Sequence, residues 1–219
     1  MVEDIPTDEV KSYINDNYVS KLISYLRGDS AKVVNNKEFS NVYQLVIYHC
    51  DTTDNNQLIY NTLDEFIQEY LDNEVDPLIK NKGGEQLLSN LSNSWKNFCI
   101  YSKLMERIFE YLNRYYLRNN TMQLIGEKCQ QMFKDRIFDR SRDKITEAIL
   151  GRITSQRNGE QTNRDIVRNS ISVFVDIGLV KPKPMRNAQG QFVWQGDRSL
   201  CVYDDFFEQA FLKKTQEEF

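Results

Sequence analysis

Residues that could carry out catalysis are few in this sequence. Its 219 residues include a single histidine, His49, and four cysteines that form no CxxC pair. A zinc site needs several cysteine, histidine or carboxylate ligands, often with cysteines and histidines at short spacings. A histidine-rich metal site is therefore excluded, and we expect neither a metal nor a cofactor.

A nucleophile and its base are equally hard to find. Cys50 directly follows His49, but neighbouring residues on a helix point about 100° apart and cannot easily form a hydrogen-bonded pair. We interpret His49 as a residue at a helix end, beside a thiol of the core. The run Lys82-Gly83-Gly84-Glu85 lacks the spacing and the lysine of a phosphate-binding loop. The sequence therefore predicts a protein that is not an enzyme.

The composition is typical of a soluble globular protein, with 40% hydrophobic and 27% charged residues. A net charge of −4 gives no electrostatic reason to expect a nucleic acid or an anionic membrane as partner. No apolar run approaches the roughly 20 residues that span a bilayer, and residues 1–6 lack the features of a signal peptide. The widely spaced cysteines indicate free thiols in a reducing compartment. We therefore expect a protein of the cytoplasm and nucleus.

Helices are the predicted elements throughout. Only 9 glycines and 4 prolines interrupt the chain, and the stretches between them are long, which favours helices over short strands joined by tight turns. Apolar residues recur at the three- and four-residue steps of an amphipathic helix. This spacing predicts helices over residues 8–27, 38–50, 57–74, 86–118, 122–138, 142–155, 163–177 and from 203 to the end.

The predicted connections follow from local sequence. Asn119-Asn120-Thr121 is a turn expected to cap the next helix, and Asp139-Arg140-Ser141 is expected to break the chain between two helices. Residues 181–199 include Pro182, Pro184 and Gly190 and predict a long connection, with a short strand at Phe192-Val193-Trp194. Its basic residues are interpreted as a solvated loop. They are Lys181, Lys183 and Arg186.

The helix predicted over residues 86–118 is the longest, about 45 Å at 1.5 Å per residue. Its last turns are amphipathic, with charged residues opposite the apolar face. The apolar face consists of Tyr101, Leu104, Met105, Ile108, Leu112 and Tyr115. Helices of this length usually support an elongated stack of helices.

The helix predicted over residues 38–50 has two apolar sides. One consists of Val42, Leu45, Val46 and His49. The other, here called the aromatic stripe, consists of Phe39, Tyr43 and Ile47, with Ser40 beside it. Either the helix is buried on both sides, or the aromatic stripe faces a partner. The helical wheel alone favours burial on both sides.

Several segments, in this order, resemble the N-terminal region of a cullin, the scaffold of multisubunit RING ubiquitin ligases. They are Val42-Tyr43 through His49-Cys50, Tyr111-Leu112-Asn113-Arg114-Tyr115-Tyr116, Phe133-Lys134-Asp135-Arg136-Ile137-Phe138, Gln156-Arg157-Asn158-Gly159-Glu160, Phe174-Val175-Asp176-Ile177-Gly178-Leu179, and Val202-Tyr203-Asp204-Asp205-Phe206-Phe207-Glu208 with Phe211-Leu212. Asn113 and the turn at residues 157–160 are most similar to the cullin-1 class, which pairs with Skp1 and F-box proteins.

The resemblance implies an all-α fold, an elongated helical stack of five-helix cullin repeats. Residues 1–140 would form the first repeat, which binds the adaptor, and residues 141–219 the beginning of a truncated second repeat. Because cullins continue beyond the last residue, we expect an N-terminal fragment. The resemblance further implies a non-catalytic scaffold. The RING subunit and NEDD8 would act only through the missing C-terminal part.

In the family, the substrate adaptor docks on the second helix and on the end of the long helix of the repeat. Carried over by position, this selects Phe39, Ser40, Tyr43, Ile47 and Tyr111. The resemblance thus favours an aromatic stripe that faces a partner. Cullin-1 members tend to have a larger apolar residue in place of Ser40 and an aromatic one in place of Ile47, and both departures bear on which adaptor binds.

Alternatives to a Skp1-type partner remain open at this stage. A BTB-domain or elongin-type adaptor would use a similar fold, and a stand-alone helical-repeat binding module would lack a C-terminal cullin domain in the full-length gene. Residues 181–201 form an insertion that is longer and more basic than expected from cullin-1 relatives, and the sequence assigns it no role.

Overall fold

The computed structural model describes residues 5–29, 34–161, 163–178, 183–186, 192–195 and 203–217. The regular elements of this part of the chain are helices, apart from one short β-hairpin, which confirms the prediction of a helical fold. The chain divides into two compact units. The first comprises Met1–Pro77 and Ser94–Ile137, and the second Leu78–Asn93 and Phe138–Phe219. The assignment of residues 1–140 and 141–219 to successive cullin repeats stays a prediction.

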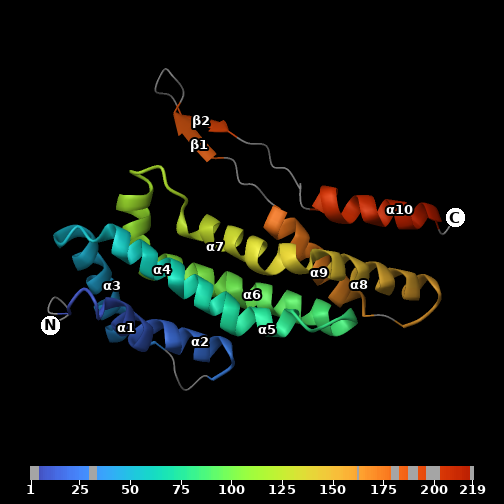
Figure 1. The fold of residues 1–219 in the computed structure, drawn as a ribbon, viewed down its shortest axis with the longest axis horizontal. Helices are drawn as coiled ribbons and strands as arrows, with labels where there is room; N and C mark the ends of the chain where they lie inside the picture. The colour runs from blue at the N-terminus through green and yellow to red at the C-terminus, as the bar shows by residue number, and fades with distance from the viewer. Residues whose placement is uncertain are drawn as a thin grey trace. The chain divides into compact units, whose positions relative to one another are not determined.

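The first helical segment of the first unit joins α1 (Val10–Ile14), a wider π-helical turn η2 (Asn15–Val19) and α2 (Ser20–Leu26), which follow one another in line (Figure 1). Gly28 ends the segment with a φ of 95°. In this left-handed conformation the next N–H, of Asp29, reaches the carbonyl oxygen of Ser24 at 3.0 Å.

The second segment consists of α3 (Asn36–Ile47) and the π-helical turn η3 (Tyr48–Thr52), and it packs on α1 and η2. Asn35 begins α3 with a reciprocal cap. Its side-chain oxygen accepts from the Glu38 N–H at 2.9 Å, and the Glu38 carboxylate accepts from the Asn35 N–H at 3.2 Å. The predicted core side of this helix is confirmed by its four buried members, Val42, Leu45, Val46 and His49.

The third segment begins with α4 (Asn56–Tyr70) and continues through η4 (Leu71–Val75) into α5 (Asp76–Ile79). The long helix follows as α6 (Gly84–Ile108) and η5 (Leu112–Leu117). These two parts are continuous, because the Phe109 N–H bonds the Met105 carbonyl and the Asn113 N–H bonds the Phe109 carbonyl, both at 3.0 Å. The prediction of one long helix over residues 86–118 is therefore confirmed, with its last turns widened.

Aromatic rings fill the core of the first unit. Tyr70 and Tyr101 stack with ring centroids 4.1 Å apart, and Trp95 meets Phe133 edge-on at 4.8 Å. The hydroxyl of Tyr101, which is fully buried, donates to the Phe66 carbonyl at 3.1 Å. Its polar group is thus satisfied inside an apolar environment, as a buried tyrosine requires.

The predicted break at residues 139–141 is wrong. Helix α7 (Ile125–Phe133) continues through η6 (Lys134–Phe138) directly into α8 (Asp139–Arg157), and Phe138 itself has helical angles, φ −68° and ψ −54°. Aspartate, arginine and serine lower helix propensity by only tenths of a kcal/mol, up to about 0.7, and no glycine or proline lies at the junction. The buried side chains of Ile137 and Phe138 instead hold the backbone in place through the junction.

The predicted cap at residues 119–121 is also wrong. Helix α7 begins three residues later than expected, at Ile125, and the residue before it, Leu124, makes no side-chain cap. Thr121 has a φ of 56°, and this left-handed residue lies between η5 and Leu124, whose backbone is extended where it enters α7.

The second unit contains α8, α9 (Arg164–Gly178), η7 (Tyr203–Glu208) and α10 (Gln209–Glu217). Gly159, with a φ of 85°, lies in the turn between α8 and α9 and confirms the turn predicted at residues 157–160. Phe174 is the centre of the core, with Phe138 at 4.7 Å and Phe207 at 5.7 Å between ring centroids.

The hairpin confirms the predicted strand. Strand β1 (Lys183–Arg186) pairs antiparallel with β2 (Phe192–Gln195), with Lys183 opposite Gln195 and Arg186 opposite Phe192. The other residues of 181–201, Lys181 among them, lie outside the described residues, and so do the side chains of the predicted basic cluster.

Candidate partner-binding site

The sequence-level interpretation of His49 and Cys50 is confirmed. Both are buried, at 2% and 5% exposure. Burial lowers the pKa of His49 and raises the pKa of the Cys50 thiol to about 12. Near neutral pH the Cys50 thiol therefore stays protonated and lacks the thiolate that a nucleophile needs, while His49 stays neutral in the core. Among the described residues, no cluster of three or more histidine, cysteine, aspartate or glutamate side chains is arranged to hold a metal ion.

The aromatic stripe of α3 lies at the surface. Phe39 and Tyr43, one helical turn apart, stack with ring centroids 6.1 Å apart and planes only 9° from parallel. Phe39, Tyr43 and Ile47 are all half-buried, and Ser40 beside them is exposed. The interpretation that α3 is buried on both sides is therefore wrong, because one face forms core and the other borders solvent.

The long helix holds Phe39 from its other side. The Arg107 guanidinium carbon lies 5.6 Å from the centroid of the Phe39 ring, within the range of a cation–π contact. Tyr18 meets the same ring edge-on at 6.1 Å, and its hydroxyl donates to the Leu104 carbonyl at 2.8 Å. Burial raises the pKa of Tyr18 to about 12, so its hydroxyl stays a donor at physiological pH.

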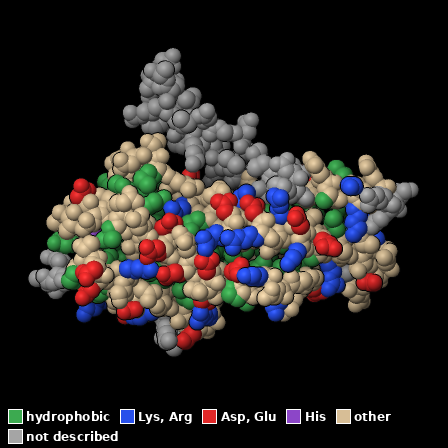
Figure 2. Space-filling view, in the orientation of Figure 1, with side chains coloured by type: hydrophobic (Ala, Val, Ile, Leu, Met, Phe, Trp, Pro, Cys, Tyr) green, Lys and Arg blue, Asp and Glu red, His purple; other side chains and the backbone are tan. Residues whose placement is uncertain are grey.

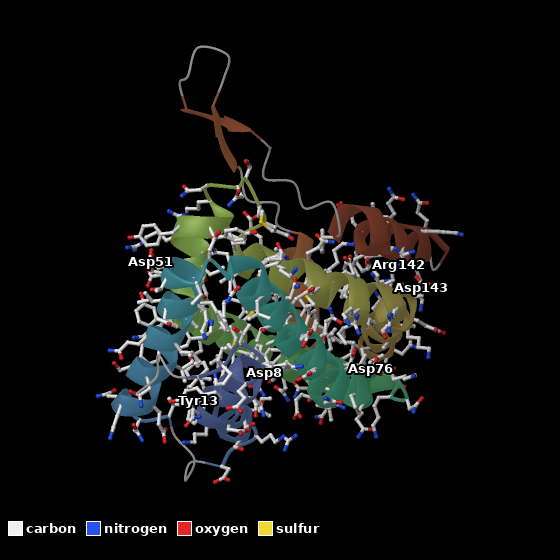
Figure 3. All side chains as sticks on the ribbon, turned by 60° about the vertical axis from the view of Figure 1, so that its left-hand side comes forward. Asp8, Tyr13, Asp51, Asp76, Arg142 and Asp143 are labelled. Atoms are coloured by element: carbon white, nitrogen blue, oxygen red, sulfur yellow. The ribbon has the colours of Figure 1, made fainter. Side chains whose placement is uncertain are left out.

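Tyr111 connects the end of the long helix to the end of α3. Its hydroxyl donates to Asp51 Oδ1 at 2.8 Å, and this hydrogen bond raises the pKa of Tyr111 to about 12. Asp51 lies in η3, the turn that continues α3, and Figure 3 shows it at this end of the helix. The Tyr111 ring is 4.6 Å from that of Tyr115, which is 51% exposed.

The structure thus joins the two elements that carry the predicted site residues. Phe39 with Arg107 and Asp51 with Tyr111 link the helix of the aromatic stripe to the long helix at two places. Sequence reasoning missed the contacts of Arg107 and Tyr18 with Phe39, because the spacing of residues along one helix gives no sign of a ring on another.

Asn113, which the resemblance placed in the Tyr-Leu-Asn-Arg run, has a structural role. It is 7% exposed, its Oδ1 accepts from the Ile125 N–H at 3.2 Å, and its Nδ2 donates to Glu106 Oε1 at 3.3 Å. Asn113 thereby satisfies the first N–H of α7, which has no cap of its own. It supports the site without being exposed in it.

Ion pairs characterise another surface of the first unit. Lys128 pairs with Asp64 at 3.0 Å, Arg136 with Asp72 at 2.6 Å, and Lys11 with Glu65 at 2.7 Å. Figure 2 shows acidic and basic side chains interspersed on one face of the molecule. Within the described part of the chain, every helix is too short or too polar to cross a membrane.

Comparison with known families identifies the chain. The Cullin alpha solenoid domain matches residues 17–219, and the chain therefore belongs to the cullin family. It is 25% identical over 200 residues to Cullin-1 of Oryza sativa subsp. japonica, covering 90% of this chain and 24% of that protein. It is 29% identical over 160 residues to Cullin-like protein 3 of Arabidopsis thaliana, covering 73% of this chain and 62% of the relative.

A third relative agrees with these two. Cullin-1 of Caenorhabditis elegans is 27% identical over 168 residues, covering 72% of this chain and 20% of that protein. The chain thus spans about a quarter or less of the length of the two Cullin-1 relatives. The prediction of a cullin N-terminal region is confirmed, and with it the helical-repeat class of the fold.

Proposed function

We propose that this chain is the adaptor-docking part of a cullin that acts as the scaffold of a ubiquitin ligase, and that its adaptor is a Skp1-like protein carrying an F-box protein. The observation that supports this most is the aromatic stripe, a pair of stacked rings at the surface of α3. Phe39, Ser40, Tyr43 and Ile47, with Tyr111 from the long helix, are the proposed contact residues.

The physical basis is pre-organisation. Aromatic side chains contribute a large apolar contact area and lose little conformational entropy on binding, because they have few rotatable bonds. Here the reciprocal cap at Asn35 fixes the start of α3, and the bond between Tyr111 and Asp51 at 2.8 Å fixes its end against the long helix. A partner would meet rings that are already in place.

The proposal assigns binding and positioning to this chain, and no bond-making step. Burial raises the pKa of the Cys50 and Cys129 thiols to about 12, so neither is a thiolate near neutral pH. In the proposed complex, the RING subunit and NEDD8 would act through other parts of a cullin.

The test is calorimetric binding of this chain to the Skp1–F-box pair of its own species. A Phe39→Ala/Tyr43→Ala double variant should lose binding while its helical circular dichroism stays unchanged. Tyr60→Ala is the matched control, because Tyr60 is a half-buried aromatic residue on α4 that contacts Lys128 through its ring and hydroxyl. This control should bind like the wild type.

Other outcomes separate the parts of the proposal. If the wild type does not bind Skp1–F-box, the adaptor assignment is wrong, and BTB-domain and elongin-type adaptors are measured in the same way. If none of the three binds, the docking function itself is contradicted. If the double variant binds as tightly as the wild type, docking occurs elsewhere on the chain.

A further inference from the structure

A groove lies beside the aromatic stripe, within the first unit. It has a volume of about 270 Å³ and runs between α2, the start of α3 and α6. Its main lining residues are Tyr18, Leu22, Tyr25, Phe39, Leu104 and Arg107.

The lining favours an apolar side chain. Tyr18 and Leu22 are 3% and 4% exposed, so they form fixed walls of the groove and not mobile surface groups. Tyr25, at 50% exposure, reaches further into solvent. Such a concave, mostly apolar surface with few polar groups is the usual environment of a buried anchor residue in an interface.

One cation of the groove is uncompensated. Arg107 is exposed and lies over the Phe39 ring, and within the described part of the chain its guanidinium makes no ion pair. Lys21, which also lines the groove, is instead neutralised by Glu38 at 2.5 Å. Hydrogen bonds from Lys21 and from the Asn35 backbone lower the pKa of Glu38, so its carboxylate stays ionised near neutral pH.

The groove is continuous with the proposed docking surface. Phe39 belongs to the aromatic stripe, where its ring stacks on that of Tyr43 at 6.1 Å. Phe39 also lines the groove. Arg107 precedes Tyr111 by four residues, one turn along the long helix, so both lie on the same side of it. A partner that covers the aromatic stripe and Tyr111 would also cover the groove.

We propose that the groove receives an apolar side chain from an acidic segment of the docked adaptor complex, with a carboxylate of that segment paired to Arg107. This inference rests on the proposed function and specifies the chemistry that the partner must present. An apolar anchor would fill the space between Tyr18, Leu22 and Phe39, and the neighbouring carboxylate would meet the free guanidinium.

The first experiment reverses the charge. Arg107→Glu should weaken binding of the Skp1–F-box pair about tenfold or more, because a carboxylate would then face a carboxylate, and the loss should shrink as salt is added. Lys96→Glu is the matched control. Lys96 is exposed on the same helix, about 16 Å from Arg107 along the axis at 1.5 Å per residue, and its reversal should leave affinity unchanged.

The second experiment fills the groove. Asn36 is exposed and lines the groove at the start of α3, so Asn36→Trp would place a large ring in the space that the anchor needs without disturbing the core. It should also weaken binding. Gln131→Trp, at an exposed position on α7, is the control for adding a tryptophan.

The outcomes distinguish this inference from the function on which it rests. If the wild type binds and Phe39→Ala/Tyr43→Ala does not, but Arg107→Glu and Asn36→Trp bind like the wild type, the groove inference is overturned and the docking function stands. A loss with Arg107→Glu alone would show long-range attraction without an anchor and would also overturn it. If the wild type binds no adaptor, both proposals fail together.

Discussion

Helices α3 and α9 have the same pattern of burial but differ in the types of their half-buried apolar side chains. Each has a buried row that forms core and a second apolar row, at intervals of four residues, that is only half-buried. In α3 the second row is the aromatic stripe. In α9 it is an aliphatic stripe, which consists of Val167, Ile171 and Val175.

The difference lies in how the two stripes are held. In the aromatic stripe, Phe39 is fixed by Tyr43, Tyr18 and Arg107. The aliphatic stripe lines an open groove of about 490 Å³ bordered by charged residues, Arg164, Arg168 and Asp176. Short β-branched side chains are stiff and suit close packing against another helix, whereas rings with set orientations suit selective recognition. The two half-buried apolar rows therefore differ in side-chain type and in how firmly their side chains are held.

The buried rows should show the largest effects. Leu45→Ala in α3 should lower the free energy of unfolding by roughly 2–5 kcal/mol, and Phe174→Ala in α9 by roughly 3–5 kcal/mol, because each leaves a cavity at a fully buried position. Urea unfolding followed by circular dichroism measures both. A loss below about 1 kcal/mol in either variant would mean that this row is not core, and the common plan of the two helices would be refuted.

Binding should separate the two stripes. Phe39→Ala/Tyr43→Ala should weaken adaptor binding about a hundredfold or more, as expected for two hot-spot rings. Ile171→Ala/Val175→Ala removes a comparable pair from the aliphatic stripe and should leave affinity within about twofold. Calorimetry on all three proteins provides the comparison. Equal losses in the two double variants would remove the distinction drawn between the stripes.

A substitution at Asn113 tests whether this residue stabilises the fold or contacts the adaptor. Asn113→Ala should cost roughly 1–3 kcal/mol of stability, because the Ile125 N–H loses its buried acceptor, while adaptor affinity of the folded protein changes little. Asn119→Ala, at an exposed position in the turn after η5, should be nearly neutral. If Asn113→Ala instead weakened binding at unchanged stability, Asn113 would belong to the contact surface.

Alkaline pH should produce the smallest and most specific effect. The hydrogen bond to Asp51 raises the pKa of Tyr111 from 10.0 to about 12, and burial does the same for Tyr18. A folded-state pKa above the unfolded value means that the stabilisation is complete below pH 10 and is lost as the pH rises toward 12. Ultraviolet titration of tyrosinate should show both residues ionising late, and Tyr111→Phe should remove one late-titrating group. An unchanged late phase in that variant would show that the hydrogen bond does not hold Tyr111.

The spacing of apolar residues along the sequence predicted much of the fold. The three- and four-residue spacing of apolar side chains identified the core row of α3 and the long helix from 86 to 118, which the structure has as α6 and η5. Its failures are also local. Residues 139–141 have modest helix propensity, and the packing of Ile137 and Phe138 outweighed it.

The sequence by itself determined the family, the helical class and the identity of the aromatic stripe, because each depends on residue types at short spacings. Tertiary structure decided that the stripe borders solvent, that Asn113 caps a helix beginning 12 residues later, and that Arg107 lies over Phe39. These contacts join residues on different elements. The hydrophobic period of a single helix carries no information about them, since it reports which face is apolar and not what lies against that face.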